Sequence, residues 1–365
     1  MNNIAPLTLW QKRQAVLLYK FSSLDYLKEM QLALNELIAY VEKLLDLAKK
    51  QGRDKVLVSY EWGNRNTSEN WANNAWPFLK DFQLTTARQI GERNNHKYSI
   101  TGFNQFHRGI SEFSTNWAST EEEANIEKYI KRISIFCKYI DLTLDKFSTS
   151  SRWNDFTLYK AWLHFENHYF KLPRIKIRED IMADTNTVPP KSGVYFSATD
   201  SNAALQFSWA AGPHGKVLPG RTFNQLGMAA LDYTGRDGLW SDGEKMLQFV
   251  MLNKNNTLLK EDAFYSDSKT SVLAPSLVAR NAFATCNGKW IHVELVDGEY
   301  EDDEGPNDHQ SANLVKLSGG EICKIPGYYF TPARANLRQL FNVGEVLPNF
   351  ESDYVVTIWQ WDANQ

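Results

Sequence analysis

The spacing of hydrophobic residues changes near residue 173, and this change restricts the chain to a mixed architecture. Before that point apolar side chains recur every three or four residues, as on one face of a helix. The clearest such stripe comprises Leu24, Leu27, Leu34, Leu37, Ile38, Val41, Leu44 and Leu45. Later apolar runs are short, aromatic and β-branched, and Gly and Pro separate them, which is typical of strands. The sequence therefore predicts an α+β protein, with an N-terminal helical bundle followed by a mainly antiparallel β domain.

In the first half the pattern predicts helices at residues 7–20, 24–51, 120–140 and 153–169. Ser23 is the expected N-cap of the second helix. Thr120 and Glu123 have the spacing of a capping box at the start of the third. The intervening segment, residues 60–117, is polar and rich in Asn and Trp, and its pattern supports no assignment.

In the second half the pattern predicts strands at residues 204–210, 290–296 and 354–361. One helix interrupts them, with Thr222 as the expected N-cap and Gly235 at its end. A turn-rich stretch between residues 173 and 190 is the expected linker. These features predict a helical domain at residues 1–180 and an α+β domain at residues 185–365.

One phrase occurs twice in the second half, within residues 190–222 and again within residues 325–350. The identical pairs are Gly193/Gly327, Tyr195/Tyr329, Phe196/Phe330, Gly215/Gly344, Val217/Val346, Leu218/Leu347 and Pro219/Pro348. The shared positions include no nucleophile, no general base and no metal ligand. We therefore interpret the phrase as two copies of one β unit, and a pair of equivalent binding surfaces is the alternative.

Composition and charge exclude several classes of protein. With 20 Phe, 16 Tyr and 12 Trp, the chain has aromatic surface for a packed core and for a partner. The absence of a long apolar run predicts a soluble protein without a membrane span. Cys137, Cys286 and Cys323 are scattered, which predicts a cytoplasmic location. Residues 1–180 are basic and residues 181–365 are acidic; the chain lacks the basic stripe of a nucleic-acid binder, and its acidic half favours a basic partner.

Two stretches of the second half are candidate binding segments. Residues 235–245 place Arg236 and Trp240 among glycines and acids, where Arg236 could bind a partner. The alternative is a rigid connector with Trp240 buried and Arg236 paired with Asp242. Residues 297–308 contain seven acids and no Lys or Arg: Asp297, Glu299, Glu301, Asp302, Asp303, Glu304 and Asp308. Their mutual repulsion predicts a mobile loop at the tip, with a long hairpin following the strand at Trp290 as one form of it. The loop is either merely solvated or a decoy that enters a basic cleft.

Catalytic motifs are missing from the sequence, which contains no nucleophile elbow, no phosphate-binding loop and no dinucleotide fingerprint. His164 and His168 stand four residues apart on an expected helix, a spacing at which two imidazoles can share a metal. Phe165 occupies the place of the glutamate in the zinc-protease motif, so ordinary surface histidines are the preferred interpretation. We expect no catalytic residue, no metal and no cofactor.

The stretches "SGVYFS…LQFSWAAG…GKVLPGRTFNQLGMAALDYTGRDGLWSDGEKMLQFV" and "IPGYYFTPA…LFNVGEVLP…YVVTIWQWDANQ" resemble a group of bacterial immunity proteins. These proteins accompany polymorphic toxins that Rhs elements and type VI secretion deliver, and the similar group is numbered seventy-one and seventy-two. The resemblance covers residues 185–365. It implies a cytoplasmic antidote that binds the effector domain of its cognate toxin and blocks it, without catalytic residues of its own.

Within that resemblance, the acidic run would fill the basic cleft of the toxin, such as that of an ADP-ribosyltransferase or a nuclease. Trp240 and Tyr328 are candidate aromatic anchors for the same interface. Two other functions remain open at this point. One is an enzyme that reverses the modification made by the toxin, and the other is a small-molecule-binding module with Tyr195 and Tyr329 in one pocket.

Overall fold

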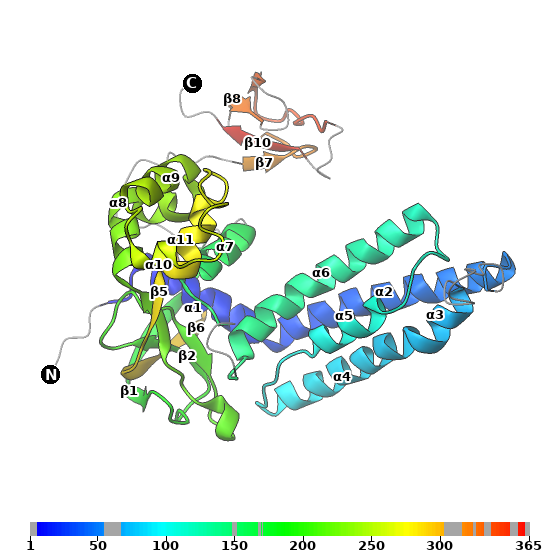
Figure 1. Ribbon diagram of the computed structural model, residues 1–365, viewed down its shortest axis with the longest axis horizontal. Helices are drawn as coiled ribbons and strands as arrows, with labels where there is room; N and C mark the ends of the chain where they lie inside the picture. Colours follow the sequence, from blue (N-terminus) through cyan, green and yellow to red (C-terminus); the bar gives the residue numbers. More distant parts are fainter. Residues whose placement is uncertain are drawn as a thin grey trace. The chain divides into compact units, whose positions relative to one another are not determined.

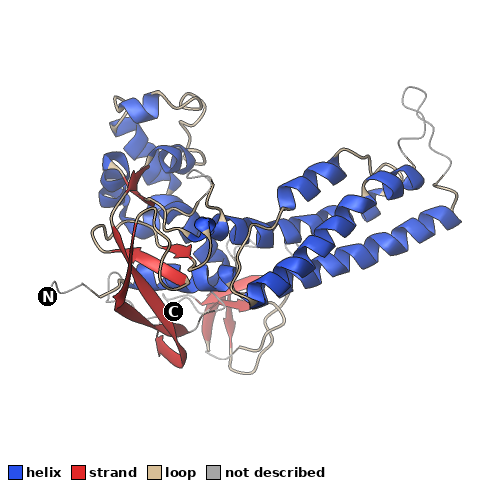
Figure 2. Ribbon diagram, turned by 90° about the horizontal axis from the view of Figure 1, so that it is seen from below, coloured by secondary structure: helices blue, strands red, loops and turns tan. Residues whose placement is uncertain are grey.

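The computed structural model of the chain describes residues 6–54, 67–147, 152–166, 169, 171–302, 316–323, 326–331, 337–350 and 357–361. It has helices in the N-terminal part and antiparallel sheets in the C-terminal part, which confirms the mixed fold class (Figure 1, Figure 2). The chain divides into two compact units, residues 1–303 and residues 304–365. No helix in these described ranges is both long enough and apolar enough to cross a membrane.

Helices form most of the first half of the larger unit. Their bounds are α1 Leu9–Ser22, α2 Leu24–Lys50, α3 Ser68–Asn74, α4 Trp76–Asn94, α5 Phe103–Ser111, α6 Thr120–Leu144 and α7 Asp155–Phe165. The long helices α2, α4 and α6 run side by side (Figure 1), and the apolar stripe of α2 is buried between its neighbours. The segment that the sequence pattern left unassigned, residues 60–117, supplies α3, α4 and α5.

The first sheet has the antiparallel strand order β1-β6-β2-β3. Its strands are β1 Lys171–Asp184, β2 Gly193–Ser197, β3 Gln206–Ser208 and β6 Lys289–Asp302. Helices and sheet share one hydrophobic core, which contains Leu17 of α1 together with Val194 and Val293 of the strands. The predicted domain boundary at residues 180–185 therefore falls inside this unit, and most of the expected linker before residue 185 is strand β1.

A helical insertion interrupts the first sheet between β3 and β6. It begins with β4 (Gly220–Phe223), which pairs with β5 (Phe283–Cys286). Between them lie α8 Gln225–Ser241, α9 Gly243–Leu252, α10 Thr257–Lys260 and α11 Ala274–Asn281. These helices enclose a separate hydrophobic core that includes Phe249 and Leu277.

The smaller unit contains a second sheet with the strand order β7-β10-β8-β9. Its strands are β7 Lys316–Ser318, β8 Gly327–Phe330, β9 Arg338–Phe341 and β10 Ile358–Trp361. The buried side chains of this unit are Cys323, Tyr329, Phe341, Leu347 and Trp359.

The two sheets have matching strand orders and matching hydrogen bonds. Gly193 and Gly327, which open the two phrases, begin β2 and β8, and each of these strands pairs with an edge strand, β3 or β9. Fully buried tryptophans, Trp290 and Trp359, occupy β6 and β10. Each tryptophan pairs with the penultimate residue of the strand on its other side, β1 or β7.

Near the end of each phrase, the backbone forms a hydrogen bond with a turn that precedes the strand begun by its glycine. The residues that make this bond are offset by one position between the two copies. Asn186 and Gly320 both have positive φ, 68° and 91°. Their N–H groups donate to the carbonyl oxygens of Val217 and Leu347, each at 2.7 Å. Val217 therefore corresponds in structure to Leu347, although sequence identity matches it with Val346. Val217 and Leu347 are fully buried, whereas Val346 is 60% exposed.

The cap of α6 lies one residue earlier than the sequence pattern predicts. The side-chain oxygen of Ser119 accepts from the N–H of Glu122 at 3.3 Å, and the N–H of Ser119 donates to the carboxylate of Glu122 at 2.8 Å. Thr120 with Glu123 was the wrong register of the capping box. Adjacent Ser and Thr followed by consecutive glutamates allow either register, and only the backbone conformation selects one.

The expected limits of α8 are also wrong. Thr222 belongs to β4, and Asn224 is the N-cap, where its side chain accepts from the N–H of Gly227 at 3.0 Å. Gly235 has φ of 72° and forms a kink between two helical segments instead of ending the helix. The pairing of β4 with β5 extends to Phe223, and it therefore delays the start of the helix.

The one-residue offset between the two phrases can be tested by truncating adjacent side chains. We expect Leu347→Ala to destabilise the smaller unit by about 2–3 kcal/mol, because it removes fully buried methyl groups. Val346→Ala should change stability by less than about 0.5 kcal/mol, since its side chain is exposed. Native-state hydrogen exchange of residues 316–350 measures both values. Equal costs, or a larger cost at Val346, would contradict the offset.

Candidate partner-binding site

The first part of the acidic run is a strand. Asp297, Glu299, Glu301 and Asp302 lie in β6, whose final residues pair with the start of β1. The expectation of a loop is thus wrong for residues 297–302. The partner strand has the basic sequence "KLPRIKIR", which supplies opposite charges across the pair. Asp303, Glu304 and Asp308 lie outside the described residues.

Two of the acids in this strand already form ion pairs within the protein. Glu299 pairs with Arg174 of β1 at 2.6 Å, and Glu301 pairs with Lys12 of α1 at 2.7 Å. The Arg174–Glu299 pair is exposed and contributes at most about 1 kcal/mol, so a partner protein can replace it at little cost. Asp297 is exposed on the same strand. An acidic face remains, but it is smaller than the number of acids in the sequence suggests.

Further along the same strands Glu294 joins two cations. Arg178 donates to its carboxylate at 2.8 Å and Lys191 at 2.6 Å. The hydrogen bonds from Lys191 and Arg178 lower the pKa of Glu294 to about 2. This carboxylate is therefore charged throughout the physiological range and is occupied by internal partners.

Arg236 takes part in an internal ion pair. Its guanidinium contacts Asp155 at the start of α7, whose side chain is 4% exposed. The indole N–H of Trp10 donates to the same carboxylate oxygen at 2.8 Å. The expected alternative, a pair between Arg236 and Asp242, is wrong, because Asp242 instead caps α9 and accepts from the N–H of Lys245. Arg236 thus ties the helical insertion to α1 and α7.

Replacement of Arg236 should destabilise the larger unit strongly. Arg236→Met leaves the Asp155 carboxylate buried without its cation, and we expect a loss of about 3–5 kcal/mol of unfolding free energy. The double variant Arg236→Met/Asp155→Asn should recover part of this loss, since it removes the buried charge as well. Urea unfolding measures the difference, with Arg174→Met as the exposed control. An Arg236 variant as stable as the control would show that the ion pair is not structural.

The two aromatic candidates lie in different units. Trp240 is in the last turns of α8, and its side chain is not described. Tyr328 is half-buried in β8, with the guanidinium carbon of Arg338 3.9 Å from its ring centroid. That geometry is a cation–π contact across the β8–β9 pair. Tyr195 and Tyr329 are each fully buried in their own sheets, so neither exposes a ring to a small molecule.

A groove of about 760 Å³ opens on the helical part of the larger unit. Its lining comes from α3, α5, α6 and the loop between α5 and α6. Trp71, Ile110 and Ile126 are buried beneath it, and Phe113 and Ile130 are half-buried along it. The polar lining residues are His107, Ser111, Ser114, Thr115, Glu123, Glu127, Lys131 and Ser134. An apolar groove with polar groups around it can accept apolar side chains of a partner helix or loop.

Sequence reasoning missed this groove because much of its lining belongs to the unassigned segment. The available signal was the combination of Trp71, Phe103, Phe106 and Phe113 in a stretch otherwise rich in polar residues. Such spacing does not reveal which rings are buried in the bundle and which are left at the surface.

Asp141 of α6 fixes the segment that leads into α5. Its two carboxylate oxygens accept from the backbone N–H and the hydroxyl of Thr101, at 2.7 and 2.9 Å. Burial raises the pKa of Asp141 to about 6, although the bonds from Thr101 act in the opposite direction. The wall of the groove at Phe103 is thus held by a carboxylate that is costly to ionise.

The raised pKa of Asp141 predicts a definite pH dependence. Between pH 4 and 6 the folded state binds the proton of Asp141 more tightly than the unfolded state, so its contribution to stability falls as pH rises. Asp141→Asn should therefore gain stability relative to the wild type over this range, by roughly 1–2 kcal/mol. Urea unfolding of both proteins at pH 4 and pH 7 gives the difference. A difference that does not change with pH would contradict the burial of a titrating carboxylate here.

The histidine pair is only partly described. His164 is exposed on α7, and His168 lies outside the described residues. Within the part of the chain that the structure describes, no three His, Cys, Asp or Glu side chains form a group that could hold a metal ion.

Comparison of the chain with protein-family models, with curated proteins and with solved structures finds no match.

Proposed function

We propose that this protein is an immunity protein that binds the effector domain of a cognate secreted toxin, of the Rhs or type VI kind, and blocks its active site. The observation that carries the proposal is the groove of α3, α5 and α6, which leaves Phe113 and Ile130 partly exposed. Large apolar side chains around a groove at a protein surface are typical of a protein interface. The resemblance of residues 185–365 to immunity proteins supports the same function.

The charge of the second half indicates the kind of partner. Asp297 and Glu299 are exposed on β6, and further acidic residues follow them in the sequence. A toxin with a basic cleft, such as a nuclease or an ADP-ribosyltransferase, would be attracted to this face and oriented by it. In this proposal the antidote acts in the cytoplasm of the cell that produces the toxin, and neither nucleic acid nor a membrane is its target.

The proposal requires the groove to contribute binding energy. We expect Phe113→Ser with Ile130→Asn to weaken the complex with the toxin domain by at least about tenfold, because both changes remove apolar contact area. Leu32→Asn is the matched control, since Leu32 is 62% exposed on α2 and does not line the groove. Calorimetric titration measures affinity, and thermal unfolding checks the fold of each variant. A folded groove variant with unchanged affinity would place the interface elsewhere.

The acidic run is expected to affect the rate of binding more than its final strength. Replacing all seven acids by Ser or Asn should lower the association rate and its dependence on salt. Stopped-flow mixing at low and high ionic strength measures both. If the rate and the salt dependence stay the same, the acidic run does not guide the toxin.

An enzyme that reverses the modification made by the toxin is the main alternative. The two functions differ in stoichiometry, because a blocking protein must match the toxin mole for mole. Residual toxin activity should fall linearly and vanish near an equimolar ratio. Protection by trace amounts would contradict blocking and indicate catalysis.

A further inference from the structure

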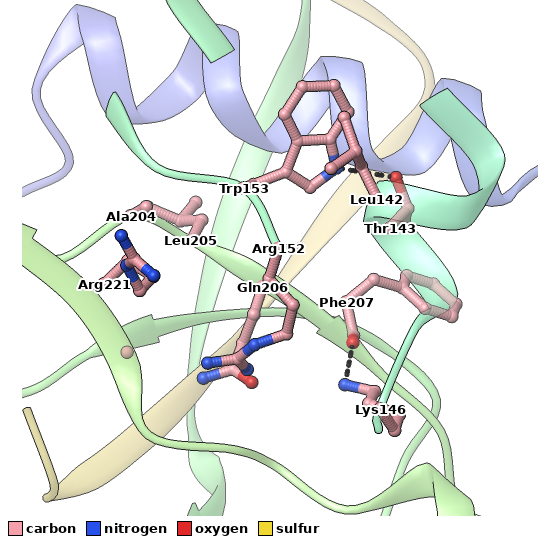
Figure 3. Close-up of a pocket in the computed structure, with 11 residues that line it drawn as sticks. Leu142, Thr143, Lys146, Arg152, Trp153, Ala204, Leu205, Gln206, Phe207 and Arg221 are labelled. Atoms are coloured by element: carbon pink, nitrogen blue, oxygen red, sulfur yellow. Dashed lines mark hydrogen bonds between the residues drawn. The ribbon is translucent and has the colours of Figure 1, made fainter. Parts of the chain in front are cut away.

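Three cations that are buried or partly buried lie away from the groove and away from the acidic strand. Lys146 follows the end of α6, Arg152 precedes α7, and Arg221 is in β4. Figure 3 shows the three side chains around one pocket, together with Gln206 and Thr143. None of the residues that line this pocket is an Asp or a Glu.

Two of the three cations, Lys146 and Arg152, are held in place by hydrogen bonds to uncharged acceptors. The ammonium of Lys146 donates to the carbonyl oxygen of Phe207 at 2.7 Å and to the hydroxyl of Ser208 at 3.1 Å. The guanidinium of Arg152 donates to the carbonyl oxygen of Pro219. Arg152 is 8% exposed, and its buried Nε has no hydrogen-bond partner among the described residues. These bonds fix the cations with neutral acceptors, so their charges are not neutralised by the same contacts.

Such an arrangement is unfavourable without a counter-ion. Burial is the largest cause that lowers the pKa of Lys146 well below its usual value, and it lowers that of Arg152 to about 10. The neighbouring cations lower these values further, whereas Asp145, at the end of α6, raises both and Cys286 raises that of Arg152. A buried cation costs stability unless an anion accompanies it, and guanidinium groups match the oxygens of phosphate in geometry.

We propose that Lys146, Arg152 and Arg221 form a binding site for a phosphate group, either inorganic phosphate or the phosphate of a small metabolite. The pocket is narrow, so the phosphate oxygens enter it while any larger part of the ligand remains outside. Arg152 supplies a buried donor, and the partly buried Lys146 and Arg221 line the same pocket. This site is separate from the proposed toxin interface, because its residues do not line the groove or belong to β6.

Binding can be measured on the full chain with inorganic phosphate as the probe. We expect 10 mM phosphate to raise the melting temperature by at least about 2 °C relative to chloride at the same ionic strength, as a ligand of the folded state does. Calorimetric titration with phosphate gives the affinity, and acetate tests whether a carboxylate suffices. Glucose 6-phosphate compared with glucose shows whether the group can belong to an organic ligand. Loss of the melting shift in phosphate, with no heat of binding, would overturn the proposal.

Variants distinguish a binding site from a structural cluster. Arg221→Met should weaken phosphate binding by about tenfold or more, and thermal unfolding without phosphate checks that the variant is folded. Lys146→Met should weaken binding in the same way. Arg174→Met, an exposed arginine outside the pocket, is the control and should bind as the wild type does. Folded pocket variants that bind phosphate as tightly as the control would refute the assignment.

Discussion

The packing of α1 against the first sheet is the contact on which the larger unit depends. The hydroxyl of Tyr19 donates to the carbonyl oxygen of Val293 at 2.5 Å and accepts from the N–H of Val194 at 3.3 Å, so one side chain bridges β6 and β2. Burial raises the pKa of Tyr19 above its usual range and keeps the hydroxyl protonated as a donor. A side chain at Gly193 would come within 2.4 Å of His292 Nε2 and 2.7 Å of this hydroxyl. The glycine that opens the first phrase is therefore required by the close approach of His292 of β6 and of Tyr19 of the helix.

The opposite charges of the two halves of the chain meet in one strand pair. The basic residues at the end of the first half lie on β1, and the acids of the second half begin on β6, its antiparallel partner. Arg174 pairs with Glu299, and Arg178 with Glu294. Part of the charge asymmetry thus contributes to strand pairing. The acidic surface that remains available to a partner is the exposed part of β6 near Asp297. This limits how much of the binding energy the acidic run can provide.

The long amphipathic helices α2 and α6 were predictable from the sequence, whereas α3, α4, α5 and α9 to α11, the helix ends and the binding features were not. The stripe of α2 identifies that helix, because a long amphipathic period has few alternatives. Adjacent residues such as Ser119 and Thr120 can each cap a helix. The difference in capping free energy between them is smaller than the effect of the surrounding packing on where the helix begins. Of the candidate residues, the acids could be found from composition, but the internal partner of Arg236 could not, since Asp155 is far away in sequence. The cationic pocket combines residues from separate elements of the chain, and no residue spacing in the sequence indicates that they lie together.

The matching sheets indicate where binding functions can reside in this molecule. Each sheet has a tryptophan in its core: Trp290 donates to Thr185 in one, and Trp359 donates to the carbonyl oxygen of Pro348 in the other. Both tryptophans are fully buried, as are Tyr195 and Tyr329, so the shared positions serve mainly to fold the sheet. The features that differ between the copies are the helical bundle with its groove, the cationic pocket and the insertion between β4 and β5. All three features lie within the larger unit. A partner or ligand would therefore recognise these features and not the strands that the two sheets share.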